Sequence, residues 1–298
     1  MPSRQIQWFP GHMAKTRRLI SENLKNVDIV IELLDARIPR SSKNPEISTW
    51  TSGKPTLILL NKASLADPQI TGKWIDFYRA NSIAALPIDC ITGERISQIG
   101  PCVREILADK IHKFQEKGMT GRKLRAMIVG IPNVGKSSLV NKLCGQKKAR
   151  VENRPGVTLH KQWVTTTAGF DLLDMPGILW PKFEDRLTGE NLAATGAIKD
   201  AILDTDELGM ILSARLLKLY PDIFCARYKL NYEAVKELDS YDLLEEIGRK
   251  RGFLISGGEI NLERTALTVL DEFRNVKIGR ISLESPSEAC EKEHTENA

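Results

Sequence analysis

The sequence lacks the cysteine patterns of secreted and zinc-binding proteins. Its five cysteines are odd in number and scattered, without a C-x-x-C pair: Cys90, Cys102, Cys144, Cys225 and Cys290. This argues against a disulfide framework and a structural zinc site, and is typical of a reducing compartment. No apolar run approaches the roughly 20 residues needed to span a bilayer, and the N-terminal stretch lacks the apolar core of a signal peptide. We therefore expect a cytoplasmic protein.

Charge is abundant and unevenly distributed. The 298 residues have 42% hydrophobic and 27% charged content, as in ordinary globular proteins, and are long enough for one large or two smaller domains. The net charge of +5 understates how basic the body is, because residues 284–298 are acidic. Lys and Arg cluster at the start of the chain, around residues 110–125 and around residues 142–154. Such clusters favour a polyanionic partner, with nucleic acid as the obvious candidate.

Residues 126–143 contain the clearest motif. The apolar run 126–129 predicts a buried strand, and the amphipathic stretch that carries Leu139 and Leu143 predicts a helix. Between them stands G-I-P-N-V-G-K-S, the G-x-x-x-x-G-K-[ST] phosphate loop in its strand-to-helix context. Lys136 is expected to reach the β- and γ-phosphates, and the Ser137 hydroxyl to ligate Mg²⁺. The motif predicts a nucleoside triphosphate site.

The order of elements predicts the fold class. Apolar strands are expected at 28–34, 55–60, 85–88, 126–129, 162–166 and 169–173, with helices near 14–24, 68–80 and 96–117 between the early ones. This alternation predicts an α/β fold with a mostly parallel, doubly wound sheet. From about residue 188 the periodicity is helical only, around 192–203, 208–219, 234–249 and 262–276. We expect a nucleotide-binding domain with an N-terminal arm over 1–187, a small all-α domain over 188–283, and a disordered acidic tail over 284–298.

Two further segments are expected near the phosphates. Asp174-Met175-Pro176-Gly177 ends a predicted strand about forty residues after the phosphate loop. Its aspartate could hold a Mg²⁺ water, and the Gly177 N–H could meet the γ-phosphate. Thr158, in the polar stretch between the two motifs, is the natural second hydroxyl ligand for Mg²⁺.

A base-reading signal precedes the phosphate loop. Asn61-Lys62 follows a predicted buried strand, as the guanine-reading pair of GTPases does. The fourth residue of that motif is normally an aspartate, whose charged carboxylate accepts two hydrogen bonds from guanine. Here it is Ser64, which offers one neutral acceptor. We therefore expect guanine preference to be weaker by about 1–3 kcal/mol. Asp89-Cys90 stand where a small-residue loop normally meets the base.

The order of these motifs differs from that of most GTPases, in which the guanine-reading elements come last. It resembles the circularly permuted GTPases. Longer strings extend the likeness over nearly the whole chain and resemble the bacterial ribosome biogenesis GTPase A (YlqF) family: QWFPGHMAK, DARIP, NK, GIPNVGKSS, RPGVT, DMPGILWPKFED, TGAIKD and SGGEIN. The resemblance implies a P-loop GTPase domain followed by a helical RNA- or ribosome-binding domain. It also implies a GTP hydrolase that assists late assembly of the large ribosomal subunit and binds its rRNA. We further expect a monomer, without a membrane or DNA partner.

The resemblance also implies the site residues. The nucleotide contacts would be Asn61, Lys62, Ala63, Ser64, Asp89, Cys90, Asn133, Val134, Gly135, Lys136, Ser137, Ser138 and Gly177. The motifs themselves predict Mg²⁺ at Ser137, Thr158 and Asp174. Many GTPases place a glutamine directly after D-x-x-G to orient water, but here Ile178 stands there. The expected helpers are His12, on the N-terminal arm, and Asn133, which resembles an asparagine that coordinates K⁺ in related enzymes; Lys136 completes the catalytic set.

Two alternatives remain open at this stage. The chain could be a nucleotide-gated RNA-binding scaffold in which hydrolysis is incidental. It could also be a nucleotide hydrolase with relaxed choice between GTP and ATP, because of Ser64.

Overall fold

The computed structural model describes residues 10–119, 121–145, 162–180, 183, 185–198 and 204–287. Within them, six strands form one sheet in the order β3-β2-β1-β4-β6-β5. The strands are β1 (Ile29–Asp35), β2 (Thr56–Asn61), β3 (Ala84–Pro87), β4 (Leu124–Val129), β5 (Gln162–Thr165) and β6 (Phe170–Asp174). All neighbours pair in parallel except β5, which runs antiparallel to β6. The predicted mostly parallel, doubly wound sheet is confirmed.

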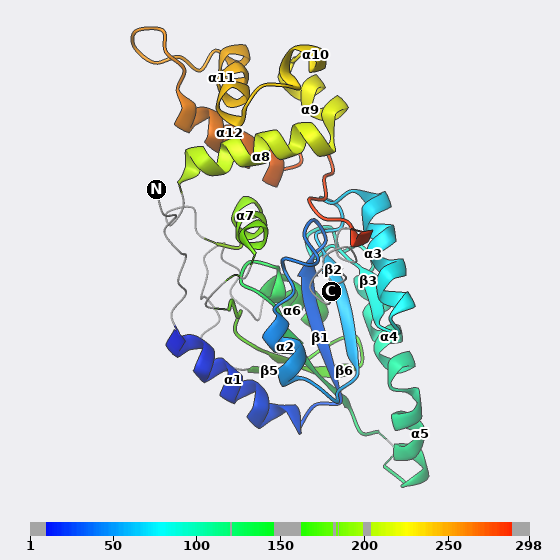
Figure 1. The fold of residues 1–298 in the computed structure, drawn as a ribbon. Coiled ribbons are helices and arrows are strands. Elements are labelled where there is room, and N and C mark those ends of the chain that lie inside the picture. The colour runs from blue at the N-terminus through cyan, green and yellow to red at the C-terminus, as the bar shows by residue number, and fades with distance from the viewer. Residues whose placement is uncertain are drawn as a thin grey trace, which may run out of the picture.

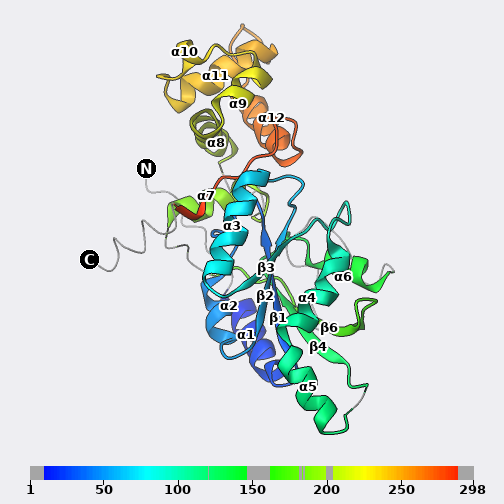
Figure 2. The same cartoon turned by 90° about the vertical axis from the view of Figure 1, so that its right-hand side faces the viewer.

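Apolar side chains on both faces of the sheet explain why its central strands read as continuous hydrophobic runs. Every residue of β1 is buried, as is expected of a parallel strand covered on both sides. Figure 2 shows α1 (Pro10–Leu24), α2 (Pro45–Trp50) and α3 (Pro68–Ala80) on one side of the sheet, with α4 (Ile99–Ile106), α5 (Ala108–Glu116) and α6 (Lys136–Cys144) on the other. On the α3 side, Trp74 and Tyr78 pack against Leu34, Ile58 and Leu60.

A helical region lies over the carboxyl ends of the strands. Beyond α7 (Arg186–Ala194) come α8 (Thr205–Leu219), α9 (Pro221–Tyr228), α10 (Tyr232–Val235), α11 (Ser240–Arg251) and α12 (Leu262–Arg274). Figures 1 and 2 both place α8 to α12 as a separate cluster, with α7 between it and the sheet. The predicted change from α/β to all-α therefore occurs where the motifs of the first part end.

Several predicted boundaries were wrong, and capping residues explain most of the differences. The helix expected over 96–117 is instead η1 (Ile96–Gln98), α4 and α5, because buried Leu107 leaves helical geometry between the last two. The helix expected over 234–249 divides because Asn231 caps α10 and Asp239 caps α11 with their side chains. Helices α2 and α9 were missed, although each begins at a proline, which suits a first helical turn.

The two ends of the chain also differ from expectation. The first helix, expected near 14–24, begins at Pro10. The tail expected from residue 284 does not begin there, because Glu284 is 7% exposed and lies against the sheet domain. Its carboxylate accepts hydrogen bonds from the Arg40 and Ser41 backbone N–H groups, at 2.8 and 3.1 Å, and from the Asn191 side chain at 2.8 Å. In Figure 1 this segment returns from α12 to the neighbourhood of α3.

Candidate functional site

The phosphate loop lies between β4 and α6, at the carboxyl edge of the sheet. Gly130, Asn133 and Gly135 all have positive φ, and α6 begins directly after Gly135. Such a turn directs backbone N–H groups toward one point at a helix N-terminus, where anions bind. A Cβ at Gly135 would lie 2.3 Å from the Asn61 side-chain nitrogen, so this position must be glycine while Asn61 passes beside it. Val134 is buried, whereas Ser137 and Ser138 are half-buried.

Lys136 is held against its own loop. Its Nζ donates to the carbonyl oxygens of Gly130 at 3.0 Å and Ile131 at 2.7 Å. The side chain is almost completely buried, and burial lowers the pKa of Lys136 to about 8, although Asp174 opposes part of this change. A bound polyphosphate would place negative charge beside the ammonium group and so favour its charged form.

The D-x-x-G segment meets the phosphate loop. Asp174 ends β6, where it pairs in register with Ile128 of β4. A Cβ at Gly177 would lie 2.9 Å from Pro132 and 3.0 Å from the Lys136 Nζ, so the glycine allows the two loops to touch. Ile178 is buried, and its backbone N–H donates to Gly130 O at 3.2 Å. The side chain at 178 offers no polar atom to orient water.

Asp174 has the properties of a carboxylate that awaits a cation. It is 4% exposed, and its Oδ1 is buried without a hydrogen-bond partner among the described residues. Burial raises the pKa of Asp174, and Lys136 counteracts only part of that effect. Within the described residues no three His, Cys, Asp or Glu side chains gather as a metal site. A Mg²⁺ ion held by one carboxylate, hydroxyl groups and phosphate oxygens fits this donor set.

Asn61 joins the base-reading loop to the other motifs. Its Nδ2 donates to Val134 O at 2.7 Å in the phosphate loop, and its Oδ1 accepts from the Cys90 N–H at 3.0 Å. Ala63 adds a bond from its N–H to Ile88 O at 3.1 Å. The structure thus brings together the three segments that the sequence placed at one edge of the sheet.

Lys62 has a partner that the sequence reasoning missed. Its Nζ lies 2.9 Å from Asp35, at the end of β1, and the same carboxylate accepts two bonds from the Arg37 guanidinium at 2.9 and 2.8 Å. Burial opposes ionisation of Asp35, but these two cations outweigh it and hold the pKa of Asp35 well below its usual range. The signal was available, because Asp35 ends a buried strand that neighbours the one ending at Asn61.

Ser64 and Asp89 lie in direct contact. The Ser64 hydroxyl donates to Asp89 Oδ2, while Asp89 Oδ1 accepts from the N–H groups of Ile91 at 2.7 Å and Thr92 at 2.9 Å. Asp89 is buried and Ser64 half-buried. Asp67, the other nearby carboxylate, is used elsewhere: it caps α3 and accepts from the Tyr220 hydroxyl at 3.2 Å.

Segments from the far end of the chain also touch the base-reading loop. Arg280 donates from Nη2 to Ala63 O at 2.8 Å and from Nε to Ala66 O at 2.9 Å. The Ile281 N–H donates to Leu65 O at 3.1 Å. The sequence offered no local signal for these contacts, because more than 200 residues separate the partners.

Two predicted site residues are not placed by their side chains. His12 lies in the first turn of α1, but its side chain is outside the described part of the molecule. Thr158 lies outside the described residues altogether. Helix α1 itself packs beside α2, with Ile20 buried in the main core.

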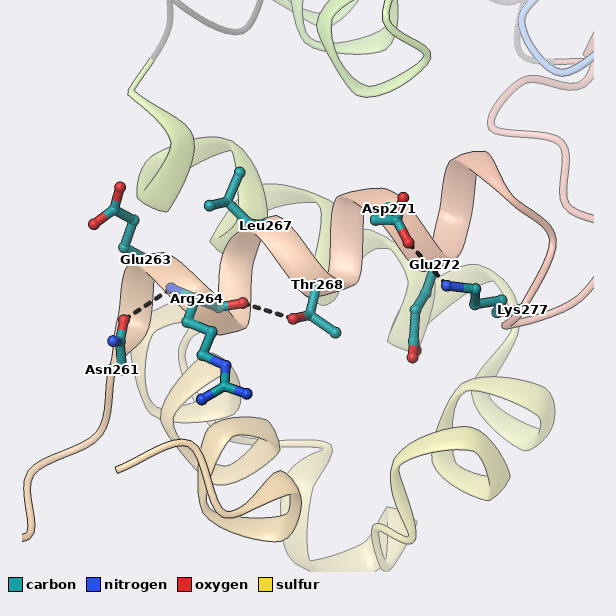
Figure 3. Close-up of a pocket in the computed structure, with 8 residues that line it drawn as sticks. All are labelled: Asn261, Glu263, Arg264, Leu267, Thr268, Asp271, Glu272 and Lys277. Atoms are coloured by element: carbon teal, nitrogen blue, oxygen red, sulfur yellow. Dashed lines mark hydrogen bonds and ion pairs between the residues drawn. The ribbon is translucent and has the colours of Figure 1, made fainter. Parts of the chain in front are cut away.

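An open pocket of about 490 Å³ lies in the helical region, apart from these motifs. Its charged side chains are largely paired. Lys277 lies 3.0 Å from Asp271 (Figure 3), and Glu272 accepts from Arg227 and Arg251. The Arg264 guanidinium lies over the Phe253 ring. The pocket therefore provides no concentrated charge for a phosphate.

Among the residues described, no helix combines the length and the apolarity needed to cross a membrane. The strand order, the phosphate loop and the preceding N-K pair define a P-loop GTPase whose elements are circularly permuted. A protein-family model described as "50S ribosome-binding GTPase" matches residues 125–219.

Known proteins extend this likeness to almost the full chain. Ribosome biogenesis GTPase A from Priestia megaterium is 48% identical over 285 residues, covering 95% of this chain and 98% of the relative. Solved structures of YlqF, one bound to GDP and one from T. maritima bound to GNP, have TM-scores of 0.62 and 0.60, with 27% and 26% identity. They cover 91% of this chain, and 100% and 98% of their own. The chain belongs to the ribosome biogenesis GTPase A (YlqF) family, and is a GTP-hydrolysing ribosome assembly factor.

Proposed function

We propose that this GTPase acts at a late step in maturation of the large ribosomal subunit (50S), as a cytoplasmic monomer that binds pre-ribosomal particles and their rRNA. The observation that carries the proposal is the position of the helical region, which lies on the side of the strand ends that bear the nucleotide motifs, with α7 between them. Loss of the γ-phosphate would change the position of the D-x-x-G segment, residues 174–177, and through the following residues the position of α7. Nucleotide state would then control how the helical region meets the particle.

The nucleotide would be held by the segments that converge at the sheet edge. Residues 133–138 would cradle the phosphates, with Lys136 on the β- and γ-phosphate oxygens and the Gly177 N–H on the γ-phosphate. Residues 61–64 and 89–90 would face the base, with the Lys62 stem against its plane. The Asn61 bonds to Val134 O and the Cys90 N–H support this arrangement, because they fix the base loop relative to the phosphate loop.

Mg²⁺ would be held by Ser137, Asp174 and Thr158. The buried Oδ1 of Asp174, which has no hydrogen-bond partner in the part of the chain that the structure describes, supports its part in that site. When bound, the ion would neutralise charge that develops on the β- and γ-phosphates during hydrolysis.

Hydrolysis would depend on a group other than the residue after D-x-x-G, because Ile178 is apolar and buried. His12 would orient the attacking water, or a K⁺ ion held by Asn133 would supply positive charge. Replacing His12 with alanine would then lower the ribosome-stimulated rate about 100-fold, the size of a general-base contribution, while nucleotide affinity stays nearly unchanged. An unaltered stimulated rate would remove His12 from the mechanism.

RNA contact would come from the basic surface, although part of it is neutralised within the molecule. At the end of α11, the exposed Arg249 lies 2.7 Å from Glu246, whereas Arg251 lies 3.1 Å from the buried Glu272. The Arg249 pair is of the weak, surface kind, so a phosphate could replace its carboxylate. We expect such binding to fall steeply with salt.

The deciding experiment is co-sedimentation of the full-length protein with 50S subunits and their precursors, with a non-hydrolysable GTP analogue and with GDP. The proposal predicts binding with the analogue and release with GDP. Equal affinity in the two states would refute the coupling, and failure to bind either particle would refute the assignment. The competing scaffold role is tested by a hydrolysis-deficient variant, which would still support subunit maturation if hydrolysis were incidental.

A further inference from the structure

We propose that Asp89 is a specificity-determining positioning residue, which fixes the Ser64 hydroxyl as a hydrogen-bond acceptor for guanine. This inference rests on the proposed base site. It assigns a role to the carboxylate that follows β3, in place of the aspartate that GTPases normally carry at position 64. At this point the hydroxyl comes from the loop after β2 and the carboxylate from the loop after β3.

The first step in the argument is the direction of the contact between the two side chains. A hydroxyl has one hydrogen to give and two lone pairs to receive, whereas an ionised carboxylate can only accept. Asp89 is buried and accepts from the Ser64 hydroxyl and from the Ile91 and Thr92 N–H groups. The hydrogen of Ser64 is thereby committed to Asp89.

The charge state of Asp89 supports that direction. Burial by itself opposes ionisation, but the hydrogen bonds from Ser64, Thr92 and Ile91 outweigh it and lower the pKa of Asp89. The carboxylate is therefore ionised at neutral pH and has no proton to donate to Ser64. The Lys62 ammonium nearby favours the same state.

The second step is what remains for the base. With its hydrogen committed, the half-buried Ser64 hydroxyl presents only lone pairs to a ligand. On the edge of the base that carries N1 and C2, guanine has hydrogen-bond donors at N1 and the 2-amino group, whereas adenine has an acceptor at N1 and no 2-amino group. A fixed acceptor at Ser64 pairs with a guanine donor but finds no donor on adenine. Polar sites reject close analogues in this way, because their buried polar groups are then left unpaired. A serine without Asp89 could rotate its hydrogen toward adenine N1.

The two loops are rigidly placed for this purpose. The Ala63 N–H donates to Ile88 O at 3.1 Å, and Asn61 Oδ1 accepts from the Cys90 N–H at 3.0 Å, so each residue of the pair is flanked by a bond between the loops. Arg280 also donates to the Ala63 carbonyl oxygen, at 2.8 Å. The arrangement limits the loss of guanine preference expected from Ser64 alone.

The test compares dissociation constants for GDP, IDP and ADP in the full-length protein. In D89N the amide keeps an oxygen for the Ile91 and Thr92 N–H groups but turns a donor toward Ser64, which frees the serine hydrogen. We expect the ratio of ADP to GDP dissociation constants to fall about tenfold, since one hydrogen bond changes from favourable to unmatched. IDP, which lacks the 2-amino group, reports which guanine donor Ser64 receives.

A double-mutant cycle separates positioning from general damage. S64A should lower the ratio, and D89N should then have no further effect in the S64A background. S64D/D89N returns a carboxylate to position 64 and should restore the ratio. D239N is the matched control. The Asp239 side chain also accepts from a backbone N–H group, that of Asp242 at 2.8 Å, but it caps α11 in the helical region.

The outcomes are distinct. An unchanged ratio in D89N, or an equal effect of D89N with and without Ser64, would overturn the inference. An equal weakening for all three nucleotides would also overturn it, because it would indicate a structural role only. If the wild-type protein bound no guanine nucleotide, the proposed base site itself would fail. If wild type binds GDP and N61A does not, while the D89N ratio is unchanged, only the role of Asp89 fails.

Discussion

The side-chain amide of Asn133 donates to the carbonyl oxygen of Gly196 at 3.0 Å, which ties the phosphate loop to the turn after α7. The neighbouring carbonyls of Ala193 and Ala194 each accept from Arg274, on α12, at 2.9 Å. A short path of hydrogen bonds therefore runs from the phosphate loop to the helical region. It is a second route beside the covalent one through residues 174–185.

This path predicts that Asn133 couples nucleotide state to the helical region. In N133A we expect the difference in 50S affinity between the GTP-analogue and GDP states to shrink about fivefold, the worth of one hydrogen bond of about 1 kcal/mol. Hydrogen exchange of α12 should also become less sensitive to the nucleotide. N81A is the control, because Asn81 makes an equivalent amide-to-carbonyl bond at the exposed end of α3. A full nucleotide response in N133A would show that the bond carries no coupling.

Stimulation by K⁺ is a separate readout of the same variant. If Asn133 ligates K⁺, N133A should hydrolyse GTP at the same rate in KCl and in NaCl, whereas the wild type should prefer KCl. Retention of the preference would assign the ion to other ligands.

Nucleotide affinity should depend on pH through Lys136. Burial lowers the pKa of free Lys136 to about 8, and a bound polyphosphate raises it, so the charged form is favoured in the complex. Affinity should therefore be level below pH 8 and fall as the pH rises above 8, with uptake of a proton on binding. Calorimetry in buffers of different ionisation enthalpy measures that proton directly. An affinity that is constant from pH 7 to pH 9.5 would contradict the prediction.

Stability should depend on pH through Glu32. This residue lies in the middle of β1, is 3% exposed, and has an Oε1 atom without a hydrogen-bond partner among the described residues. Burial raises the pKa of Glu32 from 4.5 to about 7, and Lys43 opposes this only in part. Because the charged form is penalised in the folded state, the contribution of Glu32 to stability is greatest below pH 4.5 and is lost as the pH rises to about 7.

The variant E32Q removes that titration. Its free energy of unfolding relative to wild type should rise by up to about 3 kcal/mol between pH 4.5 and 7, and stay level above. Urea unfolding at a series of pH values measures the difference. E259Q, on an exposed loop, is the matched control variant. Parallel pH curves for wild type and E32Q would show that Glu32 does not titrate in this range.

Glu284 should stabilise the junction between the return segment and the sheet domain. E284A leaves the Arg40 and Ser41 N–H groups and the Ser41 hydroxyl without their acceptor, and removes one of the two acceptors of the Asn191 amide, which should cost about 2–4 kcal/mol. E284Q keeps one acceptor oxygen and should cost less. Chemical unfolding measures both, with S287A at an exposed position as the control. A cost below that of the control would mean that the hydrogen bonds add no net stability.

Local patterns were enough for the parts of this protein that depend on neighbours in sequence. The phosphate loop was readable because a strand, two glycines and a helix must follow one another within about twenty residues for the backbone to bind phosphate. The alternation of apolar strands and helices predicted the sheet for a similar reason. The order of the N-K pair and the phosphate loop identified the permutation, since it is a property of the chain itself.

Contacts between distant residues were decided only by the tertiary structure. The carboxylate of Asp89 lies against Ser64 because β2 and β3 pair in parallel and end at one edge. The loop after β2 lacks the usual aspartate at position 64, and the loop after β3 brings a carboxylate to the same place. Glu284 reads as the first residue of an acidic tail, yet it is buried because Arg40, Ser41 and Asn191 converge on it. Sequence patterns record the periodicity of single elements, whereas the partner of a charged or polar side chain depends on which elements the fold brings together.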